Sequence, residues 1–160
     1  MERTFVQGGV NERQLWQKAA SMDSNLQQAF WTWALTRYED IELRDCLLAL
    51  QESRGLVVVE ALFFAWLAEQ GRQLDLSEAQ HMEEAITPWV ERVLLPLRRE
   101  RVAWGKSEDA QRLYREALRL ELEAEKTLAA LLCETLAPQL AVTGPVSCQH
   151  NLSLITSLSC

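Results

Sequence analysis

Glycine and proline are scarce in this chain, with six and four residues among 160, and no Asn-Gly or Asp-Gly pair offers a tight β-hairpin turn. Valine clusters only once, at residues 57–59. These absences argue against a β-rich fold, because strands need β-branched residues and frequent turns. Helix-forming residues dominate instead. The sequence therefore predicts an all-α fold, a single compact bundle of five or six helices.

Positive charge is also in short supply, since 16 Lys and Arg residues face 23 Asp and Glu residues, for a net charge of −7. This balance opposes binding of the chain as a whole to nucleic acid or to an anionic membrane. The most apolar run, residues 56–68, contains Glu60 and is too short to span a bilayer. No apolar segment follows the first residues as in a signal peptide. A cytoplasmic location is expected.

Residues that carry chemistry are few as well. The four cysteines have no CxxC spacing, and the sequence has no GxSxG motif or glycine-rich phosphate loop. The spacing of Glu78 and His81 matches half of a di-iron motif, but the other histidine is the distant His150, so the set is incomplete. The sequence predicts no metal site and no cofactor. Catalysis would depend on carboxylates whose pKa is shifted by burial. An enzyme is not the favoured prediction, and the sequence leaves that question open.

Glycines, prolines and capping residues divide the chain into helices. Gly55 and Gly71 each follow an apolar stretch and are expected to end a helix. Ser77 begins a capping box that would open another helix, which Pro88 is expected to end or kink. The expected helices cover residues 25–39, 43–53, 57–70, 77–88, 88–104 and 107–138.

Two of these helices have distinct roles. The helix at 57–70 is apolar almost all round, so it is expected to be the central element. The helix from residue 107 carries an apolar stripe and is expected to be long and C-terminal. We expect residues 1–24 to form a peripheral segment with a short helix through Ala20, residues 25–138 to form the helical domain, and residues 139–160 to form a flexible tail.

The stretch FWTWALTRY, residues 30–38, contains four aromatic side chains. At about 100° per residue most of them share one broad helix face, which predicts a core face and not a stacking platform. Trp33 lies at the edge of this face, one turn before Arg37, and a cation–π contact is expected between the two. The predicted core face consists of Phe30, Trp31, Ala34, Leu35 and Tyr38.

Residues 92–119 contain eight basic and four acidic residues, a net charge of +4, and are expected to form a helical hairpin that turns at Gly105. Arginines repeat at i, i+3 spacing on both sides of this turn, which suits an anion site. Pairing with neighbouring glutamates is the alternative, and it is favoured. Glu121 and Glu125 lie one turn apart and could bind a cation or an arginine of the hairpin, or be solvated. The arginines of this candidate anion site are Arg98, Arg101, Arg112, Arg115 and Arg119.

Several motifs follow one another in order: FWxWAxxxY from residue 30, CLxxLQE from 46, LFxxWLxxxG from 62, PLRxxR from 96 and ELxAE from 121. In this order they resemble a family of small bacterial proteins, domain of unknown function 2390, over roughly residues 28–132. The resemblance implies an all-helical cytoplasmic protein and supplies no activity. This chain has Val57 and Val59 where the family pattern has Asp and Asn, and Ile41-Glu42 where it has Pro-Gly. The polar matches are Gln51, Glu52, Arg98, Arg101, Glu121 and Glu125.

Three functions fit these features. The favoured prediction is a non-catalytic helical interaction protein, with another protein as its partner and a contact surface near the arginine hairpin. The second is an anion or RNA-associated binder, although the net charge disfavours nucleic acid. The third is a small-ligand binder or enzyme with a carboxylate-lined pocket between helices. The candidate binding residues are Gln51, Arg98, Arg101, Arg112, Arg115, Glu121 and Glu125.

Overall fold

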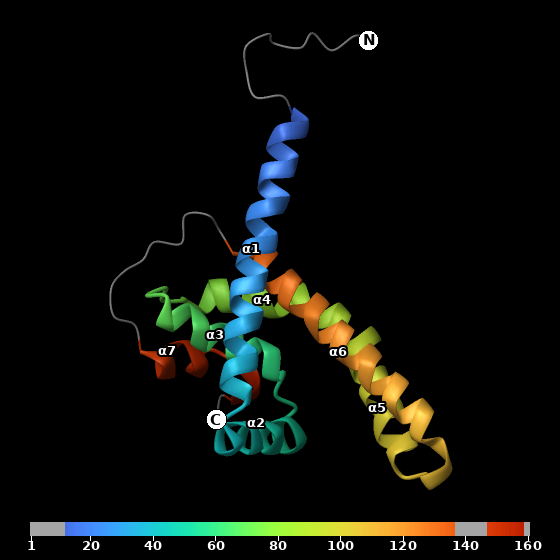
Figure 1. Cartoon of the computed structure of the whole chain (residues 1–160). Coiled ribbons are helices and arrows are strands. Elements are labelled where there is room, and N and C mark those ends of the chain that lie inside the picture. The colour runs from blue at the N-terminus through green and yellow to red at the C-terminus, as the bar shows by residue number, and fades with distance from the viewer. Residues whose placement is uncertain (1–11, 137–146, 159–160) are drawn as a thin grey trace.

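The computed structural model describes the backbone of residues 12–136 and 147–158, and side chains from Asn25 onward (Figure 1). Every regular element in these ranges is a helix, so the all-α prediction is confirmed. None of the described helices is both long and apolar enough to cross a membrane. In chain order the elements are α1 (Glu12–Tyr38), α2 (Ile41–Arg54), α3 (Val58–Glu69), α4 (Leu76–Trp89), a π-helix (Val90–Leu94), α5 (Leu95–Gly105), a 3₁₀ helix (Glu108–Ala110), α6 (Gln111–Glu134), α7 (Cys148–Ser153) and a second 3₁₀ helix (Thr156–Leu158).

The first helix is longer than predicted. α1 continues from Glu12 to Tyr38, so the predicted break between a short helix through Ala20 and a helix from residue 25 is wrong. The intervening Ser, Asp and Asn residues are moderate helix formers, and no Gly or Pro interrupts them. After α1 the chain turns at Asp40, whose carboxylate accepts the backbone N–H groups of Glu42 and Leu43 at 3.0 and 3.2 Å and so begins α2.

Helix α3 is the centre of the fold, as predicted. Most of its residues are buried, and it packs against α1, α2, α6 and α7. The Phe63 ring meets Phe30 of α1 edge-on, with centroids 5.0 Å apart, a geometry that aromatic pairs favour. Gly55 and Gly71 follow α2 and α3 with φ of 68° and 76°. Both glycines were predicted at helix ends because this backbone conformation costs glycine little.

The junction from α4 to α5 differs from the prediction in two ways. Asp75, not Ser77, caps α4 by accepting the N–H of Glu78 at 2.7 Å. Of the two outcomes predicted for Pro88, an end or a kink, the end is wrong, because the helix continues to Trp89 and passes through the π-helix into α5. A π-helical turn contains an extra residue, and such turns accommodate local irregularities within longer helices. The Trp89 indole N–H donates to the Ala124 carbonyl at 2.9 Å and fastens this junction to α6.

The chain after α6 also differs from the prediction. Helix α6 is long but is not the last element, because α7 and a 3₁₀ helix follow it. The expectation of a flexible tail is wrong for residues 147–158: α7 packs against α3, and Asn151 and Ile155 are buried. Residues 139–146 lie outside the described ranges. Figure 1 shows α5 and α6 as a hairpin that points away from α2, α3 and α7.

Glu60 is a buried carboxyl group in the middle of this apolar core. Only 4% of its surface is exposed, and its Oε1 atom has no hydrogen-bond partner among the described residues. The Glu83 side chain of α4 lies within hydrogen-bonding reach of the Glu60 carboxyl group. Glu83 accepts the N–H and hydroxyl of Thr156 at 2.9 and 2.6 Å. Burial, and secondly the bond to Glu83, raise the pKa of Glu60 to about 8.

Replacing Glu60 with glutamine should stabilise the protein at about pH 8. In the unfolded chain Glu60 ionises near 4.5, so above this value the folded protein binds the extra proton and loses stability as the pH rises towards about 8. The wild-type free energy of unfolding should fall by about 1–2 kcal/mol between pH 6 and 8 from this group. Urea unfolding followed by circular dichroism measures it, with the exposed Glu84→Gln on α4 as control. An unchanged pH profile in Glu60→Gln would contradict this assignment.

Candidate functional site

A largely apolar pocket lies in the angle between α1–α2 and the α5–α6 hairpin. Its volume is about 380 Å³, within the range of small-molecule sites. Its lining comes from α1, α2, α3 and α6, with one residue, Arg101, from α5. The lining residues are Phe30, Trp31, Ala34, Leu35, Tyr38, Leu48, Gln51, Val58, Val59, Leu62, Arg101, Leu118, Glu121, Leu122 and Glu125.

Four leucines of this lining are half-exposed. The exposed fractions are 51% for Leu35, 40% for Leu48, 44% for Leu118 and 43% for Leu122. They come from α1, α2 and α6, so three helices present apolar side chains to one space. The prediction that Leu35 is a core residue is wrong, because α6 diverges from α1 instead of covering this side chain. Apolar groups gathered in this way mark binding surfaces.

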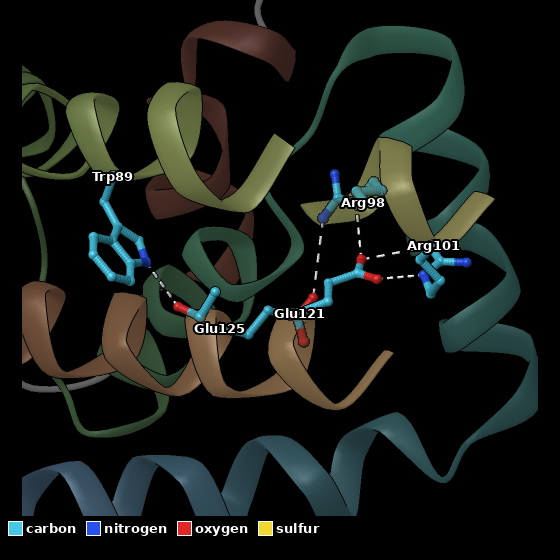
Figure 2. Close-up of polar contacts among 6 residues, drawn as sticks. Trp89, Arg98, Arg101, Glu121 and Glu125 are labelled. Atoms are coloured by element: carbon cyan, nitrogen blue, oxygen red, sulfur yellow. Dashed lines mark hydrogen bonds and ion pairs between the residues drawn. The ribbon is translucent and has the colours of Figure 1, made fainter. Parts of the chain in front are cut away.

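Glu121 is the buried anchor of the polar wall. It is 5% exposed and accepts the Nε–H of Arg98 at 3.2 Å and the Nε–H of Arg101 (Figure 2). Arg101 also donates from Nη2 to Glu121 at 3.5 Å. The hydrogen bond to Glu121 raises the pKa of Arg101. One carboxylate of α6 thus receives two guanidinium groups of α5 and joins the two helices of the hairpin.

Glu125 lies one turn further along α6 and is paired much less closely. Its nearest cationic atom is Nη2 of Arg98, at 3.9 Å from Oε1, which is beyond hydrogen-bonding distance. Burial, and secondly the charge of Glu121, raise the pKa of Glu125 to about 7, and the two arginines offset only part of this effect. Glu125 is therefore a carboxyl group in the pocket that exchanges its proton near neutral pH.

Tyr38 and Gln51 complete the polar groups of the lining. Burial, and secondly the charge of Glu125, raise the pKa of the Tyr38 phenol, so the phenol stays protonated at neutral pH. It can donate or accept a hydrogen bond, as can the Gln51 amide. Tyr38 was predicted to be a core residue; it is partly buried and packs against the core, and it also lines the pocket. Tyr38 faces the pocket because α1 and α6 diverge, and the sequence periodicity of α1 does not predict this divergence.

The structure brings four of the seven candidate binding residues together in the pocket lining. Arg98 lies beside them through its bonds to Glu121. Arg112 and Arg115 are exposed on α6 and do not line the pocket. The residues that the sequence interpretation missed include Leu118 and Leu122. Their i, i+4 spacing marks a face of α6 beside its buried stripe, and that spacing was available in the sequence. The four are Gln51, Arg101, Glu121 and Glu125.

The cation–π contact predicted between Trp33 and Arg37 is confirmed. The Arg37 guanidinium lies 5.3 Å from the centre of the Trp33 ring. Both side chains also bond to Glu69 of α3, each at 3.0 Å. Trp33 and Arg37 therefore stabilise the contact between α1 and α3, and they lie outside the pocket.

Metal coordination finds little support in the described ranges, where no three His, Cys, Asp or Glu side chains gather closely enough to hold an ion. Glu78 and His81 lie on α4, away from the pocket lining.

Comparison with known proteins identifies the family. No curated protein and no solved structure matches the chain. A family model described as "Protein of unknown function (DUF2390)" matches residues 29–132, which is more than half of the chain and includes every residue that lines the pocket. The protein therefore belongs to this family of unknown function.

Proposed function

We propose that the protein is a non-catalytic binding protein that holds a small amphipathic ligand in the pocket between α1, α2, α3 and α6. The observation that carries the proposal is the lining itself. Apolar side chains from several helices surround about 380 Å³, and a few polar groups converge on the same space. This combination is characteristic of ligand sites, since apolar walls supply affinity and a few polar groups fix orientation. The polar groups are Tyr38, Gln51, Arg101, Glu121 and Glu125.

A binding role fits the lining better than a catalytic one. The described lining contains no serine, cysteine, lysine or histidine, so catalysis there would depend on its carboxylates and on Tyr38. Arg101 and Arg98 are committed to Glu121, so neither is available to stabilise a developing negative charge. The same bonds weigh against an anion site at Arg98 and Arg101, because both guanidinium groups already have a carboxylate partner.

An amphipathic helix of a partner protein is the second candidate occupant. The half-exposed leucines at the mouth favour it, because helix-binding grooves present apolar side chains from two walls. The projecting α5–α6 hairpin would then be one of the walls (Figure 1). The two candidates differ in what remains bound to the native protein. Native mass spectrometry would detect a small-molecule adduct for the first and a complex with a second polypeptide for the second.

Titration with 1-octanol, which has an apolar chain and one hydroxyl, tests the pocket directly. We expect saturable binding with NMR shifts at residues 30–38 and 118–125. Leu118→Asp should weaken binding roughly tenfold or more, because it places a charge against the bound chain. Leu76→Asp is the matched control, since Leu76 is 56% exposed on α4 and lies outside the pocket. Shifts spread over the surface, or equal effects of both substitutions, would contradict the proposal.

A further inference from the structure

We infer that the ligand carries a cationic nitrogen, an amine or a related group, which seats on the carboxylate of Glu125 while its apolar chain lies against the leucines of the pocket. This inference rests on the proposed function and adds the chemical class of the ligand. It follows from how the two carboxylates and two guanidinium groups beside the pocket divide their contacts.

The contacts beside the pocket are unequal. Arg98 and Arg101 both direct their Nε–H groups to Glu121, and Figure 2 shows the two arginines converging on that one side chain. Among the described side chains, the ion-pair partner of Glu125 is the distant Nη2 of Arg98, at 3.9 Å. Two guanidinium groups therefore bind the Glu121 carboxylate. The Glu125 carboxylate faces the pocket, and no described cation forms a hydrogen bond with it.

The position of Glu125 on α6 directs it to the ligand space. Leu118, Leu122 and Glu125 follow each other at i, i+4 and i+7, so they share one face of α6. All three line the pocket. A chain lying along Leu118 and Leu122 would bring its head group to Glu125. The Tyr38 phenol and Gln51 amide belong to the same lining and could orient a nitrogen through hydrogen bonds.

An anionic head group is disfavoured by the same arrangement. It would have to approach Glu121 and Glu125 together, and the arginines that could attract it already donate to Glu121. A neutral head group would add no charged partner for Glu125, so the buried carboxyl group would keep its proton up to its raised pKa of about 7 and the ligand would gain no ionic contact. A cation supplies the missing partner, and hydrogen bonds between charged groups are about twice as strong as neutral ones.

Burial and Glu121 hold the pKa of Glu125 at about 7, which adds a pH signature. The charged and titratable groups around Glu125 are Tyr38 of α1, Arg44 of α2 beside Tyr38, Arg98 and Arg101 of α5, and Glu121 of α6. An alkylamine stays protonated below about pH 10, like the lysine amine. Its binding should therefore strengthen from pH 6 to pH 8, as Glu125 loses its proton.

The test compares octylamine, 1-octanol and octanoate by isothermal titration calorimetry at pH 8, with Glu125→Gln and Glu123→Gln. Glu123 is an exposed residue of α6 outside the pocket, so its variant makes the same charge change elsewhere. We expect wild-type protein and Glu123→Gln to bind octylamine about tenfold more tightly than octanol. In Glu125→Gln this preference and its pH dependence should disappear, so that octylamine and octanol bind this variant with similar affinity.

The outcomes distinguish a failure of the inferred cationic ligand from a failure of the proposed binding function. Tighter binding of octanoate than of octylamine, or a preference that survives in Glu125→Gln, would overturn the inference. If octanol binds in the pocket but the amine gains nothing, the inference fails and the proposed function stands. If none of the three probes binds saturably at residues 30–38 and 118–125, the proposed function itself fails.

Discussion

Replacing Asn151 with alanine should lower the free energy of unfolding by about 3–5 kcal/mol. Asn151 is fully buried. Its amide group donates to the carbonyl oxygens of Phe64 and Arg72 at 3.1 and 3.0 Å, and its Oδ1 accepts the N–H of Leu74 at 3.0 Å. The side chain thus satisfies three backbone groups around the turn that joins α3 to α4.

The large effect follows from what alanine would leave behind. The Leu74 N–H and the Arg72 carbonyl would lose this partner in a place that water does not reach freely, and each such loss costs about 1–3 kcal/mol. The attachment of α7 to the central helix α3 would weaken at the same time. The expected consequence is a cooperative loss of stability and not a local change at the chain end.

Thermal and urea unfolding followed by circular dichroism would measure the change. Gln149→Ala, an exposed substitution in the same helix, is the control and should stay within about 0.5 kcal/mol of wild type. A loss of less than about 1 kcal/mol in Asn151→Ala would mean that α7 contributes little to the fold, and would contradict the assignment of Asn151 as its anchor.

Two glutamates one turn apart on α6 should respond in opposite directions to the same substitution. Glu121→Gln is expected to destabilise the protein by about 2–4 kcal/mol, because it leaves the partly buried Arg98 and Arg101 without a counter-charge. Glu125→Gln is expected to leave stability at or above the wild-type value at pH 8. The reason is that burial penalises the ionised form of Glu125, and glutamine removes that penalty.

This pair forms its own matched control, since both variants remove one carboxylate from the same helix. Urea unfolding at pH 6 and pH 8 would separate them. Above its ordinary pKa of 4.5 Glu125 lowers stability increasingly until the pH passes its folded pKa of about 7, where the effect levels off, so the advantage of Glu125→Gln should be larger at pH 8 than at pH 6. Equal losses in the two variants would show that the arginines divide their contacts evenly, and would weaken the inference about the ligand as well.

The helical class and several helix ends were predictable from local chemistry. Gly55 and Gly71 follow α2 and α3 because glycine alone adopts the left-handed conformation without cost. Apolar residues on every side of residues 57–70 require a surrounded helix, whatever the arrangement of its neighbours. The misassigned features have different causes. The helix continues past Pro88 through a π-helical turn. Residues 147–158 are attached to the core by the buried Asn151 and Ile155 and by the bonds of Thr156 to Glu83. Neither feature leaves a periodic signal in the sequence.

The candidate site was likewise predictable only in part from the sequence. The sequence by itself determined that α6 would carry two glutamates on neighbouring turns and that α5 would carry Arg98 and Arg101 on one side, because 3.6 residues per turn dictates which side chains share a helix face. It did not separate Glu121 from Glu125, which are the same residue at equivalent spacing. Only the packing of α5 on α6 decided that both arginines reach Glu121, and only the divergence of α6 from α1 left Glu125 and four leucines around an open pocket. Distances between helices depend on how large side chains pack across the whole core, and a single stretch of sequence does not specify them.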